Sequence, residues 1–175
     1  MHIMIDLETM GTRPDAPIIS IGAVAFDANG PLDSFYAGVN LGSSVNSGAK
    51  IDASTVLWWM QQSDEARAAL VPKDDDYSLV GALTALSNWV TWDTVAGVWG
   101  NGASVDNVIL RESYYRTTVP CPWPFWKDRC YRTIKGMHPG VELVRNGTHH
   151  NALDDARTQA LHLMAINTAA GGIVL

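Results

Sequence analysis

The chain has 175 residues, of which 47% are hydrophobic and 17% are charged, and its formal net charge at pH 7 is −6. This length fits one domain, residues 1–175, and the high apolar content argues against a disordered chain. The negative charge argues against binding a polyanion by attraction over the whole surface. It leaves room for a local site in which metal ions supply positive charge.

The composition also bears on where the protein works. No apolar run approaches the ~20 residues that span a bilayer, so we expect no membrane association. The N-terminus lacks a basic region and a cleavage site, so we expect no signal peptide and a cytoplasmic location. Cys121 and Cys130 do not have the spacing of zinc ligands and are expected to be free thiols.

The first third of the chain alternates between apolar runs and turn residues, which predicts strands. The predicted strands cover residues 2–8, 18–27 and 34–41. The Asn29-Gly30 pair within residues 28–31 is typical of a tight hairpin turn, so the second and third strands should be antiparallel. Residues 42–50 are small and polar, which predicts a mobile loop.

From residue 52 onward, apolar residues recur with the period of a helix. The predicted helices cover residues 52–70, 77–92, 104–118 and 151–170. A buried strand is predicted at 94–100, and three prolines make 119–128 an irregular loop, whereas 129–137 fits no clear pattern. Because the strand at 94–100 follows helices, it should run parallel to the first strand. The sequence thus predicts an α/β fold, a mixed sheet with helices packed on it.

Two carboxylates end the first strand. Asp6 and Glu8 are two residues apart, so their side chains should lie side by side on one face. At about 4 Å, two like charges repel by roughly 1 kcal/mol in water and roughly 4 kcal/mol near a protein surface. Either one of the two faces solvent, or a cation belongs between them.

Further acidic residues occur near helix starts. Asp106 follows the predicted strand at 94–100, at the carboxyl end where open α/β sheets build their sites. Asp154 and Asp155 open the last predicted helix. Taken singly, each of these three could be a first-turn acid that the helix dipole favours.

The acidic residues fall into three motifs: DLETMG (6–11), NGASVD (101–106) and HNALDD (150–155). Together they resemble the DnaQ-like 3′–5′ exonuclease family, the DEDDh group within the ribonuclease H-like fold. Its first motif is Asp-x-Glu-Thr-x-Gly, its second is an Asp behind an Asn- or Gly-containing turn, and its third is His-x-Ala-x-x-Asp. Val105 departs from the Phe that many members carry before the second-motif Asp.

The third motif has two registers with the same spacing. His149 and Asp154 would require Ala at position 151, which is Asn, whereas the pair His150 and Asp155 has Ala152. A small residue there lets the helix pass close beneath the site. We therefore predict His150 and Asp155 as the functional pair.

Two further stretches narrow the resemblance. STVLWWMQQSDEAR (54–67) and WKDRCYRT (126–133) are similar to phage and prophage exonucleases of the exodeoxyribonuclease VIII-like or 3′–5′ exoribonuclease-like type. Exonuclease A of T-even phages is similar around the Trp-Trp pair. Some of these names specify DNA and others RNA as the substrate, so the resemblance does not decide between the two nucleic acids.

The resemblance implies a two-metal site for Mg²⁺ or Mn²⁺, ions that prefer hard carboxylate oxygens. The implied ligands are Asp6, Glu8, Asp106 and Asp155. His150 would remove a proton from the attacking water, a task that suits an unperturbed imidazole pKa near 6.5. By the same resemblance, Thr9 and Met10 would contact the terminal nucleotide. Trp59 and Asn101 are further predicted substrate contacts, although of the adjacent Trp58 and Trp59 one is expected in the core and the other is a candidate for stacking on a base.

The predicted function is a metal-dependent 3′–5′ exonuclease that acts on 3′ ends of single-stranded DNA or RNA and releases nucleoside 5′-monophosphates. DNA is expected slightly ahead of RNA, and the alternatives are a 3′–5′ exoribonuclease, a catalytically silent nucleic-acid-binding module and a ribonuclease H-type endonuclease. The expected setting is the cytoplasm of a bacterium or a phage-infected host. A homodimer is a further expectation, with the tail at 171–175 packing on the second copy.

Overall fold

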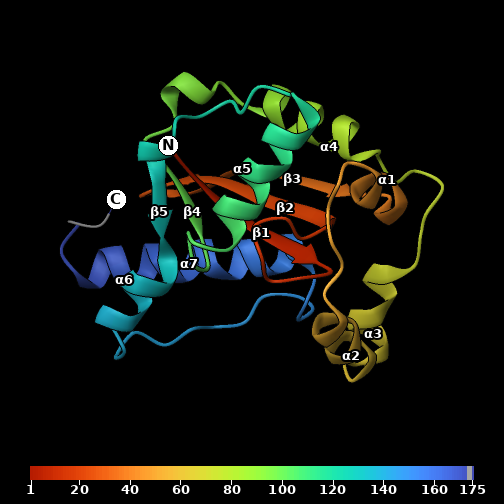
Figure 1. Cartoon of the computed structure of the whole chain (residues 1–175). Helices are drawn as coiled ribbons and strands as arrows, with labels where there is room; N and C mark the ends of the chain where they lie inside the picture. The colour runs from red at the N-terminus through yellow and green to blue at the C-terminus, as the bar shows by residue number, and fades with distance from the viewer. Residues whose placement is uncertain (173–174) are drawn as a thin grey trace.

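A five-stranded sheet forms the centre of the molecule (Figure 1), for which the computed structural model describes residues 1–172 and 175. The strand order is β3-β2-β1-β4-β5. The strands are β1 (His2–Thr9), β2 (Ile18–Asp27), β3 (Gly30–Gly38), β4 (Gly97–Gly100) and β5 (Asp128–Cys130). β2 is antiparallel to β1 and β3, whereas β4 is parallel to β1 and β5. The predicted mixed sheet is confirmed.

Seven α-helices and three short 3₁₀ turns in the described residues complete the fold. The helices are α1 (Leu41–Asn46), α2 (Ala53–Met60), α3 (Asp64–Arg67), α4 (Leu79–Trp89), α5 (Asp106–Thr117), α6 (Tyr131–Met137) and α7 (Ala152–Ala169). The 3₁₀ turns are η1 (Ala68–Leu70), η2 (Trp92–Thr94) and η3 (Phe125–Lys127). The longer helices agree with the predicted ones to within about two residues at most ends.

Two sequence predictions were wrong. The predicted loop at 42–50 contains most of α1, because the Asn40 side chain accepts a hydrogen bond from Ser43 N and starts a helix there. The predicted helix over 52–70 is broken after Met60. The Ser63 hydroxyl accepts from Ala66 N and starts a new helix, α3, because a Ser side chain readily caps a first turn.

Two further segments differ in extent. The hairpin between β2 and β3 is tighter than predicted, and the Asp27 carboxylate accepts from the N–H groups of Asn29 and Gly30. As a result β3 begins at Gly30 and ends at Gly38. The segment 129–137, which had no clear pattern, supplies the end of the short edge strand β5 and the whole of α6.

The two faces of the sheet bury different sets of side chains. Ile3, Ile5 and Leu7 of β1 belong to a core cluster that includes residues of α4 and α5. Met4 points the other way, into a cluster that includes residues of α7. Figure 1 shows α7 on one side of the sheet and α4 and α5 on the other. Since side chains alternate along a strand, Asp6 and Glu8 share the α7 face with Met4.

α7 lies very close to the sheet at its first turn. Gly22 of β2 pairs with Asp6 of β1, and a Cβ added to Gly22 would lie 2.2 Å from the backbone carbonyl carbon of Ala152. Only a residue without a side chain permits this approach. Gly22 therefore sets how near the start of α7, and the acidic residue Asp155 within it, comes to β1.

The remaining predictions concern the membrane, the cysteines and the tail. Among the described residues, no helix is long and apolar enough to cross a lipid bilayer. Cys121 and Cys130 are free, as predicted. Residues 173 and 174 of the tail that was predicted to contact a second copy lie outside the described residues.

Candidate active site

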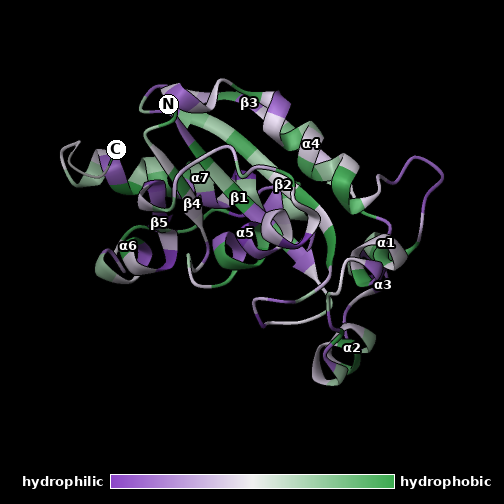
Figure 2. Cartoon of the chain, turned by 45° about the horizontal axis from the view of Figure 1, so that its top comes forward, coloured by the Kyte–Doolittle hydropathy of each residue, from purple (hydrophilic) through white to green (hydrophobic). Residues whose placement is uncertain are grey.

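A cavity of about 260 Å³ lies where β1 and β4 end, and its walls bring the predicted residues together. Its lining includes Asp6, Glu8, Asp106, His150 and Asp155. Figure 2 shows the hydrophilic colour at the arrowhead of β1, in a sheet that is otherwise largely hydrophobic. The four carboxylates and the histidine come from three parts of the chain that are distant in sequence.

The acid from the second motif is held by the end of β4. Asp106 is the first residue of α5 and is 7% exposed. The neighbouring Asn107 side chain donates to the carbonyl oxygen of Val98 at 3.0 Å, which ties the start of α5 to β4. Gly100 makes room for this contact, since a Cβ there would lie 2.3 Å from Asn107 Oδ1. The helix start is thereby fixed against the sheet.

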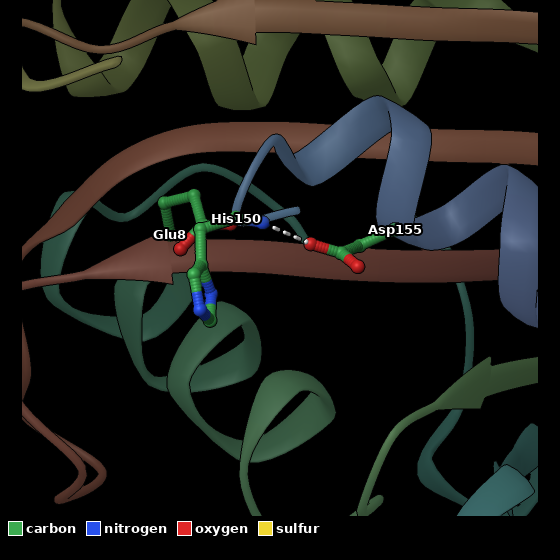
Figure 3. Close-up of side chains that lie close together, drawn as sticks. All are labelled: Glu8, His150 and Asp155. Carbon is green, nitrogen blue, oxygen red and sulfur yellow. Dashed lines mark hydrogen bonds between the residues drawn. The ribbon is translucent and has the colours of Figure 1, made fainter. Parts of the chain in front are cut away.

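The third motif is organised by the start of α7. The Asn151 side chain caps the helix by accepting from Leu153 N and Asp154 N. His150 has a left-handed backbone (φ 62°), and its N–H donates to Asp155 Oδ2 at 2.9 Å. Figure 3 shows this bond, with Glu8 across from it. One ligand atom from each of Glu8, His150 and Asp155 lies within 4.8 Å of the others.

The geometry agrees with the register chosen for the third motif. Ala152 is fully buried against Gly22, which is the close passage that the small residue was expected to allow. Asp154 does not line the acidic cavity. Its carboxylate accepts from Thr148 N at 2.8 Å and so stabilises the loop before α7. His149 does line the cavity, beside His150.

Burial and mutual repulsion dominate the electrostatics of the site. Burial raises the pKa of Asp6 well above its usual range, and the charges of Asp106 and Glu8 raise it further. Burial, and then the negative charges of Asp155 and Asp106, raise the pKa of Glu8 to about 8. Burial raises the pKa of Asp106 to about 6, although backbone hydrogen bonds oppose that rise. The cluster therefore resists full ionisation unless a positive charge enters it.

Two polar residues in the site were missed from the sequence. Gln159 donates from Nε2 to Asp6 Oδ1 at 2.7 Å, and its position one turn after Asp155 on α7 could have signalled this. Arg145 forms an ion pair with Asp155 and donates to the carbonyl oxygen of Thr148. Arg145 lies in an irregular segment, where sequence spacing gives no indication of a contact.

The two adjacent tryptophans of α2 have different surroundings. Trp59 is 2% exposed and donates from Nε1 to the carbonyl oxygen of Thr9 at 3.0 Å. Trp58 is 41% exposed, and its ring meets the His150 ring edge-on with the centroids 4.9 Å apart. Trp58 thus contacts the predicted general base, a contact that the sequence did not indicate.

The predicted substrate contacts are distributed over several places. Thr9 and Trp59 line a second, largely apolar cavity of about 460 Å³, which also includes Trp58 and shares Glu8 with the acidic cavity. Asn101 lines the acidic cavity itself. The Met10 side chain is instead buried in a core cluster with Trp59. Three of the four residues therefore line the acidic or the apolar cavity, and their contacts with substrate stay predictions.

The donor set fits divalent metal ions. Carboxylate oxygens converge on one cavity, and hard oxygen ligands suit Mg²⁺ and Mn²⁺. Gln159 Oε1, beside Asp6, is buried without a hydrogen-bond partner among the described residues, so a donor such as a metal-bound water has a place there. Burial raises the pKa values of Glu8 and Asp106 despite the nearby Arg145 and Arg132, and a bound cation would oppose that rise.

A mixed sheet with this strand order, and carboxylates from three motifs on one cavity with a histidine, define a DnaQ-like nuclease of the ribonuclease H-like fold. Over residues 1–167 the sequence matches the family described as 3′-5′ exoribonuclease Rv2179c-like domain, and the chain belongs to that family. It is a 3′–5′ exonuclease.

One curated relative is the protein named exodeoxyribonuclease from Enterobacteria phage T4. It is 28% identical over 155 aligned positions, which cover 74% of this chain and 68% of the relative. The match lies between two distantly related proteins and includes most of each.

Solved structures show the same fold at lower identity. Exonuclease X in complex with 5′ overhanging duplex DNA has a TM-score of 0.64 and 17% identity, covering 99% of this chain and 95% of that one. The nuclease domain of 3′hExo, a DEDDh family member bound to rAMP, has a TM-score of 0.62 and 15% identity, covering 99% and 93%. Escherichia coli exonuclease I in complex with a dA16 oligonucleotide has a TM-score of 0.65 and 13% identity, covering 95% and 40%. At these identities the likeness concerns the fold alone.

Proposed function

We propose that the protein removes nucleotides one at a time from the 3′ ends of single-stranded nucleic acid and releases nucleoside 5′-monophosphates. The observation that carries the proposal is the cavity at the ends of β1 and β4, which four buried or half-buried carboxylates line together with His150. The expected setting is the cytoplasm of a bacterium or a phage-infected cell, which the phage relative supports. A homodimer stays a prediction.

Asp6, Glu8, Asp106 and Asp155 would hold two divalent metal ions. When bound, such ions stabilise charge on the attacking and leaving oxygens of a phosphoryl transfer. The side chains of Gln159 and Asn107 serve this set indirectly, because the first holds Asp6 and the second holds the start of α5. Asp6 and Asp106 are thus held in place by neighbouring amide side chains.

His150 would act as the general base. Burial, and then the adjacent His149, lower the pKa of His150 below its usual value, so the ring is neutral at pH 7 and able to accept a proton. It would take a proton from a water molecule as the water oxygen forms a bond to phosphorus. The bond between phosphorus and the 3′ oxygen of the preceding nucleotide then breaks, which leaves a new 3′ end.

The apolar cavity beside Glu8 suits the base of the terminal nucleotide. Its walls include the exposed Trp58 ring, and stacking on an aromatic ring is worth roughly 1–3 kcal/mol per base. Such stacking tolerates any base, as a degrading enzyme requires. This arrangement supports single-stranded substrates, because a base in a duplex would first have to leave its partner and its stack to enter the cavity.

We place DNA slightly ahead of RNA as the preferred substrate. The relative from phage T4 is named an exodeoxyribonuclease, which favours DNA, whereas the family description names an exoribonuclease. Proteins distinguish the two sugars through contacts with the 2′-hydroxyl. The preference therefore has to be measured with both substrates side by side.

A gel assay with 5′-labelled DNA and RNA oligonucleotides of the same sequence tests the proposal. Single and double strands are incubated with Mn²⁺, Mg²⁺ or EDTA, and Asp155→Ala serves as the inactive control. We expect a ladder that shortens from the 3′ end and that EDTA or the substitution abolishes. Liquid chromatography of a parallel reaction on unlabelled strands should identify the product as a nucleoside 5′-monophosphate, and the faster substrate identifies the preferred sugar.

Intact labelled strands with every metal would refute the catalytic proposal and favour the silent nucleic-acid-binding module. Internal cuts without a ladder would instead favour an endonuclease. Thermal unfolding of Asp155→Ala alongside the wild type shows whether lost activity reflects the missing ligand or a misfolded chain.

A further inference from the structure

A second groove opens beside the acidic cavity, on the side of α6. It has a volume of about 640 Å³, and its lining includes Arg132, Lys135, His138 and Glu142. We call this space the α6 groove. Asn101 and Arg132 line both the α6 groove and the acidic cavity, so the two spaces are continuous.

The α6 groove lies opposite the apolar cavity. The apolar cavity is built on α2 and shares Glu8 with the acidic cavity, whereas the α6 groove shares Arg132 with it. Figures 1 and 2 both show α2 and α6 on opposite sides of the end of β1. The three spaces therefore follow one another in the order apolar, acidic and α6 groove.

Buried hydrogen bonds hold the wall of the α6 groove in place. Tyr131 is fully buried and its hydroxyl lies 2.7 Å from Nδ1 of His162, a residue of α7 that is 4% exposed. His162 Nε2 lies 2.9 Å from the carbonyl oxygen of Val141. Since a carbonyl can only accept, Nε2 donates to Val141, and Nδ1 forms the hydrogen bond with the Tyr131 hydroxyl. The segment after α6 is thus tied to α7, and the groove is formed before any ligand arrives.

The groove carries positive charge in a chain that is negative overall. The side chains of Arg132 and Lys135 are exposed, and neither forms an ion pair within residues 1–172 and 175. Arg132 instead donates from Nη2 to the carbonyl oxygen of Asn101 at 2.7 Å, which aims its guanidinium along the junction with the acidic cavity. Glu142 is the one carboxylate among the residues lining the groove. Two unpaired cations beside an acidic centre indicate an anionic ligand.

We propose that the α6 groove binds the phosphodiester backbone of the nucleotides that precede the scissile bond. This inference rests on the proposed function, which puts the terminal base in the apolar cavity and its phosphate in the acidic one. The strand then has only the far side on which to continue, and there the groove offers Lys135 and Arg132 to its phosphates. Lys135 is the diagnostic residue because it lines the α6 groove and not the acidic cavity.

Substrate length separates this role from catalysis. Lys135→Ala should lower kcat/KM on a single-stranded 12-mer about tenfold but leave cleavage of a dinucleotide within about twofold, because a dinucleotide does not reach the groove. The salt slope of log Kd for the 12-mer should fall by about 0.7 for each phosphate that the protein no longer neutralises. Glu142→Gln should instead raise kcat/KM on the 12-mer, because it removes a negative charge from the groove. Lys73→Ala removes an exposed lysine outside the groove and should leave kcat/KM unchanged on both substrates.

Fluorescence anisotropy of a labelled 12-mer in EDTA measures binding without metal-dependent cleavage. Unchanged 12-mer affinity and salt slope in Lys135→Ala would overturn the proposed groove, as would equal losses on the dinucleotide and the 12-mer. A wild type that cuts neither substrate yet binds the 12-mer through Lys135 would overturn the proposed function and leave the groove standing. The two proposals can therefore fail separately.

Discussion

Substituting Gly22 by Ala tests whether the distance between α7 and the sheet controls the site. The new Cβ would lie 2.2 Å from Ala152 C and 2.3 Å from Leu153 N, whereas ordinary contacts begin at 3.4 Å. Both are backbone atoms, so no side chain can rotate away. The first turn of α7 would have to retreat by about 1.2 Å, and Asp155 and His150 would retreat with it.

The size of the effect follows from this displacement. A misplacement of about 1 Å in a catalytic constellation costs roughly 10²-fold in rate, so we expect kcat to fall by about two orders of magnitude. Overpacking a well-packed contact costs about 1–3 kcal/mol in the free energy of unfolding. For a chain of this length, that lowers Tm by roughly 3–10 °C.

The assay combines exonuclease kinetics, thermal unfolding and Mn²⁺ titration on purified Gly22→Ala protein. Gly140→Ala is the matched control, because a Cβ at Gly140 meets nothing within 4 Å. At a temperature where the variant is folded, Mn²⁺ affinity should also be weaker than in the wild type. Wild-type kcat and wild-type Tm in Gly22→Ala would refute the argument that Gly22 sets the position of Asp155.

Three further predictions concern the site itself. Millimolar Mn²⁺ or Mg²⁺ should raise Tm by relieving repulsion among the carboxylates, and Asp155→Ala should shrink that rise; a Tm indifferent to metal counts against the site. Because the pKa of Glu8 is raised from 4.5 to about 8, the metal-free protein should lose stability as pH rises across that interval, and urea unfolding should show a smaller loss in Glu8→Gln. Trp58→Ala should lower kcat roughly tenfold by freeing the His150 ring, with Trp58→Phe restoring most of it; equal losses in both variants would contradict a ring contact.

Most residues of the candidate site could be predicted from the sequence because they belong to short local motifs, and the structure brings them to one cavity. The Asp6 and Glu8 pair follows from the period of a strand, and the His150 and Asp155 pair from the start of a helix. The small residue Ala152 indicated the register, and its side chain is fully buried at the start of α7. These features are local, so a single stretch of chain reveals each of them.

The features that the sequence did not reveal are contacts between distant segments or competitions between weak local signals. The contacts of Trp58 with His150 and of Arg145 with Asp155 depend on how an irregular loop returns to the sheet. The break after Met60 arose because a cap at Ser63 prevailed over continuous helical periodicity. Likewise, the short strand β5 takes its pairing from β4, and its own three residues carry little β pattern.

The bond between Gln159 and Asp6 joins residues 153 positions apart and has a consequence for biosynthesis. A ribosome makes β1, β4 and α5 long before α7, so a nascent chain holds Asp6, Glu8 and Asp106 without His150 or Asp155. Such a chain cannot complete the acidic cavity, because its last wall does not yet exist. The same holds for any fragment cut between α6 and α7. Under the proposed function, the enzyme would therefore gain activity only when α7 docks on the sheet.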